Sequence, residues 1–297
     1  MKLHILEAGL RSTVQDHPAL AAARIGLPGA GPADPLAFFA ARSLVGEPGG
    51  AAIEIVGLPF TVRCDDRRLL AVTGRDVSVR ASARLPGWIA FVARAGESVT
   101  VTGTARYAYL AVGGDLALRP VLGSRATYLP ARVGPVPRPL AAGDSLPLGP
   151  ASGLHRAGAR HPAPSYTAPV EAIGGPHADR FEREAERVFF AEEFSVAGEA
   201  DRMGVRLDGP ALRWPGADLI TCGVLPGAVQ VPRSGSPIVL GPDAQTTGGY
   251  PVIAVIASAA RGIVAQALPG ERLRFARIDA ARGAALVRAL LAGAAAA

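Results

Sequence analysis

The stretch ESVTVTGTARYAYLAVGG, from Glu97 to Gly114, contains two different strand patterns. In SVTVT (98–102), polar and apolar residues alternate, which is typical of a strand with one buried face. In YAYLAV (107–112), almost every residue is apolar, which indicates a buried strand, and the diglycine that follows ends it. Further short runs of this kind fill residues 52–150, and strands at such spacing predict an antiparallel barrel or sandwich.

The residues before this region predict one helix. Asp34 is a good N-cap, Pro35 suits the first helical position, and apolar residues follow at helical spacing until Gly46. Residues 136–169 are rich in Pro, Ala, Gly and Arg and show no period, so we expect a linker there. The predicted organisation is therefore an N-terminal β-rich half (1–135), the linker, and a second module (170–297).

The second module repeats the plan of a helix followed by strands. An amphipathic pattern predicts a helix over 179–194, and a capped Ala/Leu pattern predicts another over 279–291. Between them, apolar runs bounded by turn residues predict strands over 224–232, 237–240, 250–257, 262–268 and 273–278. The predicted fold class is mainly β with a few helices, in two modules.

Composition excludes several classes of protein. Nearly half of the residues (49%) are apolar and 19% are charged, which supports a packed core rather than disorder. The net charge of +6 comes from dispersed arginines with few aromatic residues, so we expect no nucleic-acid partner. No uncharged apolar run reaches the length of a membrane span, and residues 1–6 lead directly into a strand without a signal-peptide pattern. We therefore expect a cytoplasmic protein. Cys64 and Cys222 are isolated in the sequence, so we expect both to be free buried thiols.

The common cofactor and catalytic motifs are missing. The sequence has no G-x-x-x-x-G-K-[ST] loop for ATP and no G-x-S-x-G nucleophile elbow. Its five histidines show no zinc-ligand spacing, so we expect no metal site.

The densest group of polar residues is GPDAQTTGGYP (241–251), which lies between two apolar strands. Its carboxamide can donate and accept at once, which suits an amide or ureido ligand, and its diglycine exposes backbone N–H groups. An elaborate turn between strands explains the same residues equally well, because Asp, Thr and Gly are also turn formers. As a binding loop, it would provide Asp243, Gln245 and Tyr250 as catalytic residues, and Thr246, Thr247, Gly248 and Gly249 as substrate-binding residues.

Three other segments extend this candidate site. Gln230 lies in an apolar strand, where a buried carboxamide must find partners. Arg202 directly follows Asp201, and these two residues can form a local ion pair. Alternatively, Arg202 and Arg206 can together clamp an anion. Gln15 lies in the segment STVQD (12–16) before the first loop and is the remaining substrate-binding candidate.

Taken in order, these segments resemble the KipA / allophanate hydrolase subunit 2 / biotin-dependent carboxyltransferase family. The resemblance runs from about residue 5 to 276, nearly the whole chain, and its most specific parts are DRMG (201–204), GAVQVP (227–232) and QTTGGYP (245–251). Weaker parts are STVQD (12–16), the helix that ends in LVG (44–46), YLAVGG (109–114) and LGSR (122–125).

The resemblance implies two cyclophilin-like β-barrel-type modules and a partner of the KipI / allophanate hydrolase subunit 1 type. It implies one of two activities. One is the KipA-like subunit of an ATP-dependent 5-oxoprolinase, which opens pyroglutamate to glutamate with a third, LamB/YcsF-type subunit. The other is carboxyl transfer from carboxybiotin, held on a carrier protein, to urea or another small amide. KipA-like chains also act as antagonists of a histidine-kinase inhibitor, which leaves a non-catalytic regulator as a third interpretation.

The 5-oxoprolinase interpretation is favoured because this chain has no fused biotin carboxylase or biotin carrier. ATP is then expected on the partner subunit. In this scheme the N–H groups of Gly248 and Gly249 stabilise an oxyanion, Arg202 or Arg206 holds an anion, and Tyr250 or Asp243 transfers the proton. The sequence departs from the family pattern at Arg42, Glu47, Cys222 and Ala259, and these departures favour a changed substrate or a regulatory role.

Overall fold

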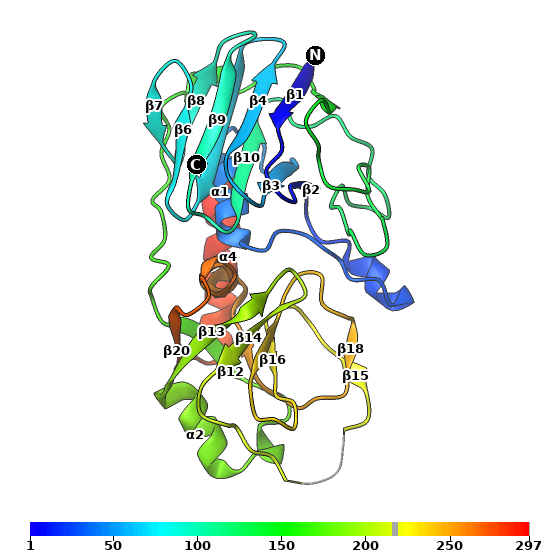
Figure 1. Cartoon of the computed structure of the whole chain (residues 1–297), viewed down its shortest axis with the longest axis vertical. Helices are drawn as coiled ribbons and strands as arrows, with labels where there is room; N and C mark the ends of the chain where they lie inside the picture. The colour runs from blue at the N-terminus through cyan, green and yellow to red at the C-terminus, as the bar shows by residue number, and fades with distance from the viewer. Residues whose placement is uncertain (216–218, 297) are drawn as a thin grey trace. The chain divides into compact units, whose positions relative to one another are not determined.

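The computed structural model describes residues 1–215 and 219–296, which form two compact units. The first contains residues 1–19 and 30–164 together with the end of the last helix, and the second contains residues 20–29 and 165–289. Figure 1 shows the mainly β character of both units, as the sequence predicted. Residues 216–218 and 297, within the predicted second module, lie outside the described residues.

The first unit is built from two antiparallel sheets. The six-stranded sheet has the order β11 (Ser145–Pro147), β1 (Lys2–Glu7), β4 (Phe60–Cys64), β9 (Ser98–Gly103), β6 (Val77–Arg80), β7 (Arg84–Pro86). The five-stranded sheet has the order β2 (Thr13–Gln15), β3 (Ala52–Ile55), β10 (Ala108–Val112), β5 (Arg68–Gly74), β8 (Ile89–Ala93). One apolar core includes side chains from both sheets, so the strands of this unit form a sandwich rather than one closed barrel.

The two strand patterns of the opening stretch correspond to two environments. In β9 buried valines alternate with more exposed residues, because only one face of the strand meets the core. In β10 every residue is buried, because helix α1 (Pro35–Leu44) packs on the side of the sheet away from that core. The rings of Phe38 on α1 and Tyr109 on β10 lie 5.9 Å apart, edge to face.

Helix α1 begins as the sequence predicted. Asp34 has extended backbone, and its side chain accepts a hydrogen bond from the N–H of Ala37 at 3.1 Å. The Thr73 hydroxyl on β5 donates to the carbonyl of Ala37 at 2.6 Å and ties the first turn of the helix to the sheet. Cap and sheet together fix where the helix lies on the five-stranded sheet.

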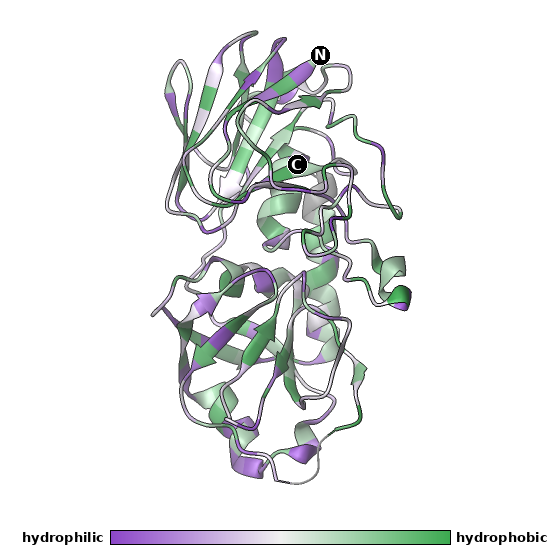
Figure 2. Ribbon diagram, turned by 45° about the vertical axis from the view of Figure 1, so that its right-hand side comes forward, coloured by the Kyte–Doolittle hydropathy of each residue, from purple (hydrophilic) through white to green (hydrophobic). Residues whose placement is uncertain are grey.

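The second unit is a closed seven-stranded barrel. Its strands follow the order β12 (Val170–Gly174), β19 (Val252–Ile256), β16 (Ala228–Gln230), β17 (Ile238–Leu240), β14 (Gly204–Asp208), β13 (Glu193–Ala200), β20 (Arg272–Arg277). The last strand returns to β12 in parallel. Helix α2 (Arg183–Ala191) contributes Phe189, which stacks on Phe275 of β20 with ring centroids 4.4 Å apart. Figure 2 shows the hydrophobic colouring that runs along the strands of both units.

The structure differs from the prediction at three places. The expected linker 136–169 contains β11, which pairs with β1, and residues up to Pro164 belong to the first unit. The helix expected over 179–194 is shorter, because β13 already begins at Glu193 and a single turn, η3 (Ala178–Arg180), precedes α2. Residues 262–268 were predicted as a strand, but Arg261–Gln266 form helix α3 after the turn η4 (Ser258–Ala260). Short apolar runs do not distinguish a buried strand from a buried helix.

The remaining elements are short turns, a two-stranded ribbon and the last helix. The ribbon is β15 (Cys222–Gly223) with β18 (Thr247–Gly248), the turns are η1 (Leu20–Ile25) and η2 (Leu154–Arg156), and the helix is α4 (Ala280–Ala296). Within the described ranges, no helix combines the length and the apolar character that a membrane crossing requires.

We predict that Asp34→Ala lowers the free energy of unfolding by about 1–2 kcal/mol, because the N–H of Ala37 loses its acceptor. Asp34→Ser keeps a capping oxygen and is the matched control, expected to lose less. Urea unfolding of both variants measures the difference. Equal stability of the Ala and Ser variants would show that the cap does not hold α1.

Candidate functional site

The candidate site is a cavity of about 670 Å³ in the barrel unit. Strands β13, β14, β16 and β17 form its walls, and the loop that contains β18 contributes two side chains. Of the residues predicted for the site, the structure brings four together around this cavity: Arg206, Gln230, Gln245 and Tyr250.

Gln230 is the buried polar group of the site. Only 2% of it is exposed, and its neighbours in the chain are the buried residues Val229, on β16, and Val231, just after this strand. Its Nε2 donates to the carbonyl of Tyr250 at 3.4 Å, and its Oε1 accepts from Nε2 of Gln245 at 3.4 Å. Both contacts are long for hydrogen bonds, so the two carboxamides keep capacity for a ligand.

The QTTGGYP loop approaches this carboxamide closely. A Cβ atom on Gly248 would lie 2.4 Å from Nε2 of Gln230, so any side chain there would displace the Gln230 carboxamide from its present position. Thr247 and Gly248 form β18 and pair with β15, and the Thr246 carbonyl accepts from the N–H of Val224. Thr246, Thr247 and Gly249 do not line the cavity, so the structure gives this part of the loop a positioning role.

Arg206 supplies a positive charge at the cavity. It lies on β14 with 58% of its side chain exposed, and its Nε is 3.9 Å from Oε2 of Glu199, which is itself 91% exposed. A loose pair of this kind is worth little, so the guanidinium can turn to an incoming anion at small cost.

Arg202 and Asp243 form a bidentate ion pair outside the set of residues that line the cavity. Nε and Nη2 of Arg202 donate to the two carboxylate oxygens at 2.8 and 2.7 Å, and the side chains are 11% and 5% exposed. The pair joins the turn after β13 to the turn after β17, where the N–H of Asp243 donates to the carbonyl of Arg202 at 3.0 Å. Neither residue is among those that line the cavity, so the structure shows the pair in a bridging position, and the predicted roles of Asp243 in proton transfer and of Arg202 in anion binding stay predictions.

Gln15, predicted to bind the substrate, makes its hydrogen bonds within the first unit. It is fully buried in the first unit, where its Nε2 donates to Thr13 and Thr127 at 2.9 and 3.1 Å. Its Oε1 accepts from the N–H of Gly31 at 3.1 Å. All of these groups belong to the protein, so Gln15 holds the loop before α1 and is not among the residues that line the cavity.

The sequence reasoning missed several lining residues. Glu199, Met203 and Ile238 line the cavity beside the predicted residues. Alternation on β14 was the available signal: Val205 and Leu207 are buried, so Gly204 and Arg206 must face the other way.

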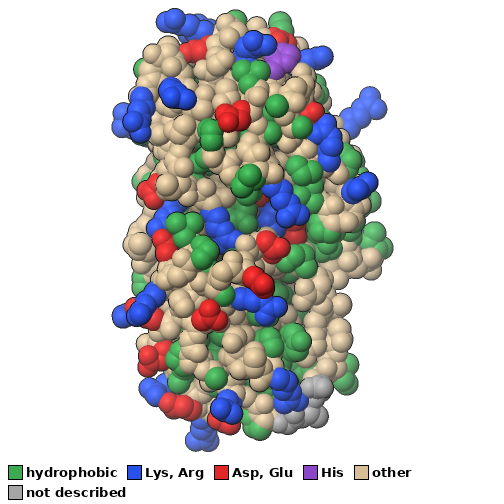
Figure 3. Space-filling view, viewed as in Figure 1, with side chains coloured by type: hydrophobic (Ala, Val, Ile, Leu, Met, Phe, Trp, Pro, Cys, Tyr) green, Lys and Arg blue, Asp and Glu red, His purple; other side chains and the backbone are tan. Residues whose placement is uncertain are grey.

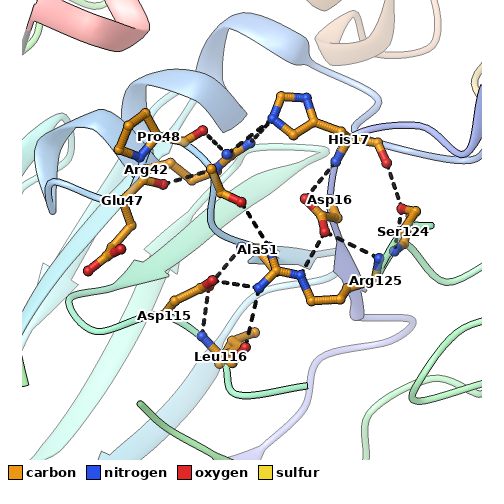
Figure 4. Close-up of polar contacts among 12 residues, drawn as sticks. Asp16, His17, Arg42, Glu47, Pro48, Ala51, Asp115, Leu116, Ser124 and Arg125 are labelled. Atoms are coloured by element: carbon orange, nitrogen blue, oxygen red, sulfur yellow. Dashed lines mark hydrogen bonds and ion pairs between the residues drawn. The ribbon is translucent and has the colours of Figure 1, made fainter. Parts of the chain in front are cut away.

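Two departures from the family pattern lie in a polar cluster of the first unit (Figure 4). Arg42 on α1 is fully buried and donates to the carbonyls of Glu47 and Pro48 and to Nε2 of His17. Burial lowers the pKa of Arg42 to about 10, so it remains a cation at neutral pH. Glu47 accepts from the N–H of Gly114 at 2.8 Å and from the Ser152 hydroxyl at 2.6 Å. Both residues thus stabilise the end of α1.

The other half of the cluster is an acid–base–acid bridge. Arg125 donates to Asp16 at 2.7 Å and to Asp115 at 2.5 Å. Asp115 also accepts from the N–H of Ala51 at 2.8 Å, which connects the bridge to β3. The bridge and Arg42 use their donors on protein acceptors, which indicates a structural cluster rather than a ligand site.

The two remaining departures are near the barrel. Cys222 is half-buried on β15, with Sγ 3.8 Å from the carbonyl of Gly248, whereas Cys64 is buried as predicted. Ala259 lies in η4, just before α3. Burial raises the pKa of the Cys64 thiol to about 12, so this thiol is inert at neutral pH.

The sequence matches the family described as carboxyltransferase domain, subdomain A and B, over residues 25–277. It is 34% identical to a 5-oxoprolinase subunit of Escherichia coli K12, over 92% of this chain and 90% of that protein. It is 30% identical to the 5-oxoprolinase subunit of the same name in Haemophilus influenzae, over 96% of this chain and 94% of that protein.

Among solved structures, the urea carboxylase of Kluyveromyces lactis superposes with a TM-score of 0.90 at 25% identity. The match covers 99% of this chain but 29% of the urea carboxylase chain, so this chain corresponds to one part of that larger enzyme.

We predict that Asp243→Asn lowers the free energy of unfolding by about 3 kcal/mol, the lower end of the cost of breaking a buried pair, because Arg202 is only partly buried and loses the charge of Asp243. Glu199→Gln, at the exposed edge of the same cavity, is the control and should stay within about 0.5 kcal/mol of the unmodified chain. Thermal or urea unfolding measures both. A stable Asp243→Asn variant without activity would return Asp243 to a catalytic role.

A second prediction concerns pH. Partial desolvation of the ring, and then the charge of Arg42, lower the pKa of His17, while Asp16 opposes this and Arg125 adds to it. Because the folded state disfavours the protonated ring, its contribution to stability is complete above the ordinary pKa of about 6.5. That contribution is lost as the pH falls below this value. His17→Gln keeps an acceptor for Arg42 but does not titrate, so its stability should decline less between pH 7 and 5. Parallel curves for the two proteins would exclude His17 as the cause.

Proposed function

Because this chain belongs to the carboxyltransferase domain, subdomain A and B, family, we propose that it is a subunit of a heteromeric, ATP-dependent 5-oxoprolinase. In this proposal it acts with a KipI-like partner and a LamB/YcsF-type subunit, in the cytoplasm. The reaction opens the lactam ring of 5-oxoproline to glutamate. The two relatives named as 5-oxoprolinase subunits, each matched over at least 90% of its length, support this assignment over the other activities of the family.

The observation that carries the proposal is the set of polar groups around one cavity. Gln230 and Gln245 bring two carboxamides to within 3.4 Å of each other, and Arg206 lines the same cavity. A carboxamide can donate to a lactam carbonyl and accept from a lactam N–H. A guanidinium pairs with a carboxylate. 5-Oxoproline carries both a lactam and a carboxylate, so its two functional groups match the two kinds of side chain.

The residues of the cavity would bind and polarise the lactam. When a water-derived nucleophile adds to the lactam carbonyl carbon, negative charge develops on the carbonyl oxygen, and donors at this oxygen lower the barrier. The C–N bond of the ring then breaks as the carbonyl re-forms. Gln245 is the donor beside Gln230, and the Tyr250 hydroxyl is the second candidate, since 46% of this residue is exposed at the cavity. Tyr250 would also supply the proton to the departing nitrogen.

ATP does not fit this cavity. A triphosphate needs several cations or a glycine-rich loop with backbone donors, but the cavity offers Arg206 together with the acidic residues Glu199 and Asp201. The sequence also has no P-loop. We therefore place ATP on the partner subunit, where it would supply the free energy for ring opening.

The second candidate function is carboxyl transfer from carboxybiotin to urea. The fit to urea carboxylase of K. lactis, over 99% of this chain, favours it. Urea itself is neutral, however, so in this reaction Arg206 would face the carboxyl group that carboxybiotin delivers, whereas in the 5-oxoprolinase reaction it would face the carboxylate of the substrate itself. The effect of Arg206 on the KM for the amide substrate therefore separates the two candidates.

We predict that Arg206→Gln raises the KM for 5-oxoproline in the assembled complex by about 10- to 100-fold, because a charge-assisted hydrogen bond worth about 1.5–3 kcal/mol is lost. Arg206→Lys keeps the charge and should recover part of this loss. Arg187→Gln removes an exposed arginine of α2 that pairs with Glu184, and is the matched control with no expected effect. ATP hydrolysis coupled to glutamate release gives the rates.

Two outcomes would redirect the assignment. An unchanged KM in Arg206→Gln, together with turnover of urea that needs bicarbonate and is blocked by avidin, would support carboxyl transfer. A complex that assembles but turns over neither substrate would support the non-catalytic antagonist.

A further inference from the structure

A face of the first unit has two cavities side by side. One, of about 560 Å³, is lined mainly by apolar residues, among them Leu6, Leu10, Leu58 and Leu140. The other, of about 540 Å³, is lined by Leu129, two prolines and three arginines: Arg11, Arg132 and Arg138. The cavities are neighbours because Leu10 and Arg11 are consecutive, and because the N–H of Leu140 donates to the carbonyl of Ser12 at 2.8 Å.

The apolar part of this face is presented on fixed backbone. Leu10 is 85% exposed, although the N–H groups of Leu10 and Arg11 both donate to the carbonyl of Val56, at 2.8 and 3.2 Å. A Cβ on Gly57 would lie 2.5 Å from Cγ of Leu10, so the absence of a side chain at Gly57 leaves the room that Leu10 occupies. Leu10 lies beside other apolar residues of the same cavity, among them Leu6 and Leu58, and an exposed group of apolar side chains on fixed backbone is typical of a protein-binding surface.

The basic part of this face carries positive charge beyond what its own acidic residues neutralise. Arg138 is neutralised by Asp144 through two hydrogen bonds at 2.8 and 2.7 Å. Arg11 and Arg132 have no ion-pair partner in the part of the chain that the structure describes. Arg132 ends a tight turn, with its N–H donating to the carbonyl of Leu129 at 3.1 Å. Glu7 is the acidic residue beside the apolar cavity, and it accepts from the Thr61 hydroxyl at 3.1 Å.

We propose that this face, formed by residues 6–11, 57–59 and 129–142, docks an acidic segment of the KipI-like subunit that carries one aliphatic side chain. The aliphatic side chain would enter the cavity beside Leu10, and the carboxylates would meet Arg11 and Arg132. Arginine and apolar anchors are the residues that dominate such interfaces. This inference rests on the heteromeric assembly proposed above, and goes beyond it by assigning the surface and the chemistry of the partner.

Exposed arginines also lie elsewhere on the chain, outside the proposed docking face. Arg and Lys side chains are scattered among acidic ones over the face seen in Figure 3. Arg80 and Arg84, paired across β6 and β7, provide a matched control: both are exposed, and they lie at the opposite side of the six-stranded sheet from β1 and β11.

The test compares the affinity of the full chain for the purified KipI-like subunit, by isothermal titration calorimetry at 50 and 300 mM salt. We expect Arg11→Glu/Arg132→Glu to weaken binding at least about tenfold, because like charges then face each other. Leu10→Ser should weaken binding at both salt concentrations, whereas the unmodified chain should bind less tightly in high salt. Arg80→Glu/Arg84→Glu should bind like the unmodified chain, and all variants should keep its melting temperature.

The outcomes separate this inference from the proposed function. If the unmodified chain binds the KipI-like subunit and both double variants bind equally well, the docking surface is overturned while the heteromer stands. If the unmodified chain does not bind, the heteromer and the surface are both overturned. If inorganic phosphate binds the unmodified chain at Arg11 and Arg132 while the partner affinity of the variants is unchanged, the cavity is a small-anion site and the docking surface is overturned.

Discussion

The buried pair between Arg202 and Asp243 is the interaction on which the rest of the candidate site depends. It joins the turn after β13 to the turn after β17, and backbone hydrogen bonds between the same two turns reinforce it. The first turn leads into Arg206, and the second leads into Gln245. A single ion pair with two parallel hydrogen bonds therefore sets the positions of the cation and of one carboxamide in the cavity. Breaking such a pair is costly because the remaining charge stays buried.

The second constraint is the close contact between Gly248 and Gln230. The loop comes near enough that a side chain at Gly248 would displace the Gln230 carboxamide, and this approach brings Gln245 and the Tyr250 carbonyl to the same group. The barrel provides an apolar frame in which few polar groups are available to a ligand. A small amide with an anionic group satisfies both the carboxamides and Arg206, whereas a neutral amide satisfies only the carboxamides.

Local sequence signals predicted the parts of the fold that depend on local physics. Asp34 and Pro35 placed the start of α1, and alternation identified β6 and β9, because caps and strand faces are encoded within a few residues. Signals failed where distant segments decide the outcome. The strand β11 lies in a Pro-rich stretch and forms because β1 offers it an edge. Arg202 and Arg206 look alike in the sequence, and only the structure shows that Arg202 pairs with Asp243, about forty residues further on, while Arg206 lines the cavity.

The proposed function and the proposed docking surface of the first unit both describe a chain that would work within an assembly. The central claim is that this chain is needed for the turnover of 5-oxoproline. The most direct measurement is 5-oxoproline-dependent ATP hydrolysis by the reconstituted complex, with this chain present and with it left out. We expect glutamate release that requires this chain and is insensitive to avidin. Equal turnover without this chain, or turnover of urea instead of 5-oxoproline, would contradict the claim.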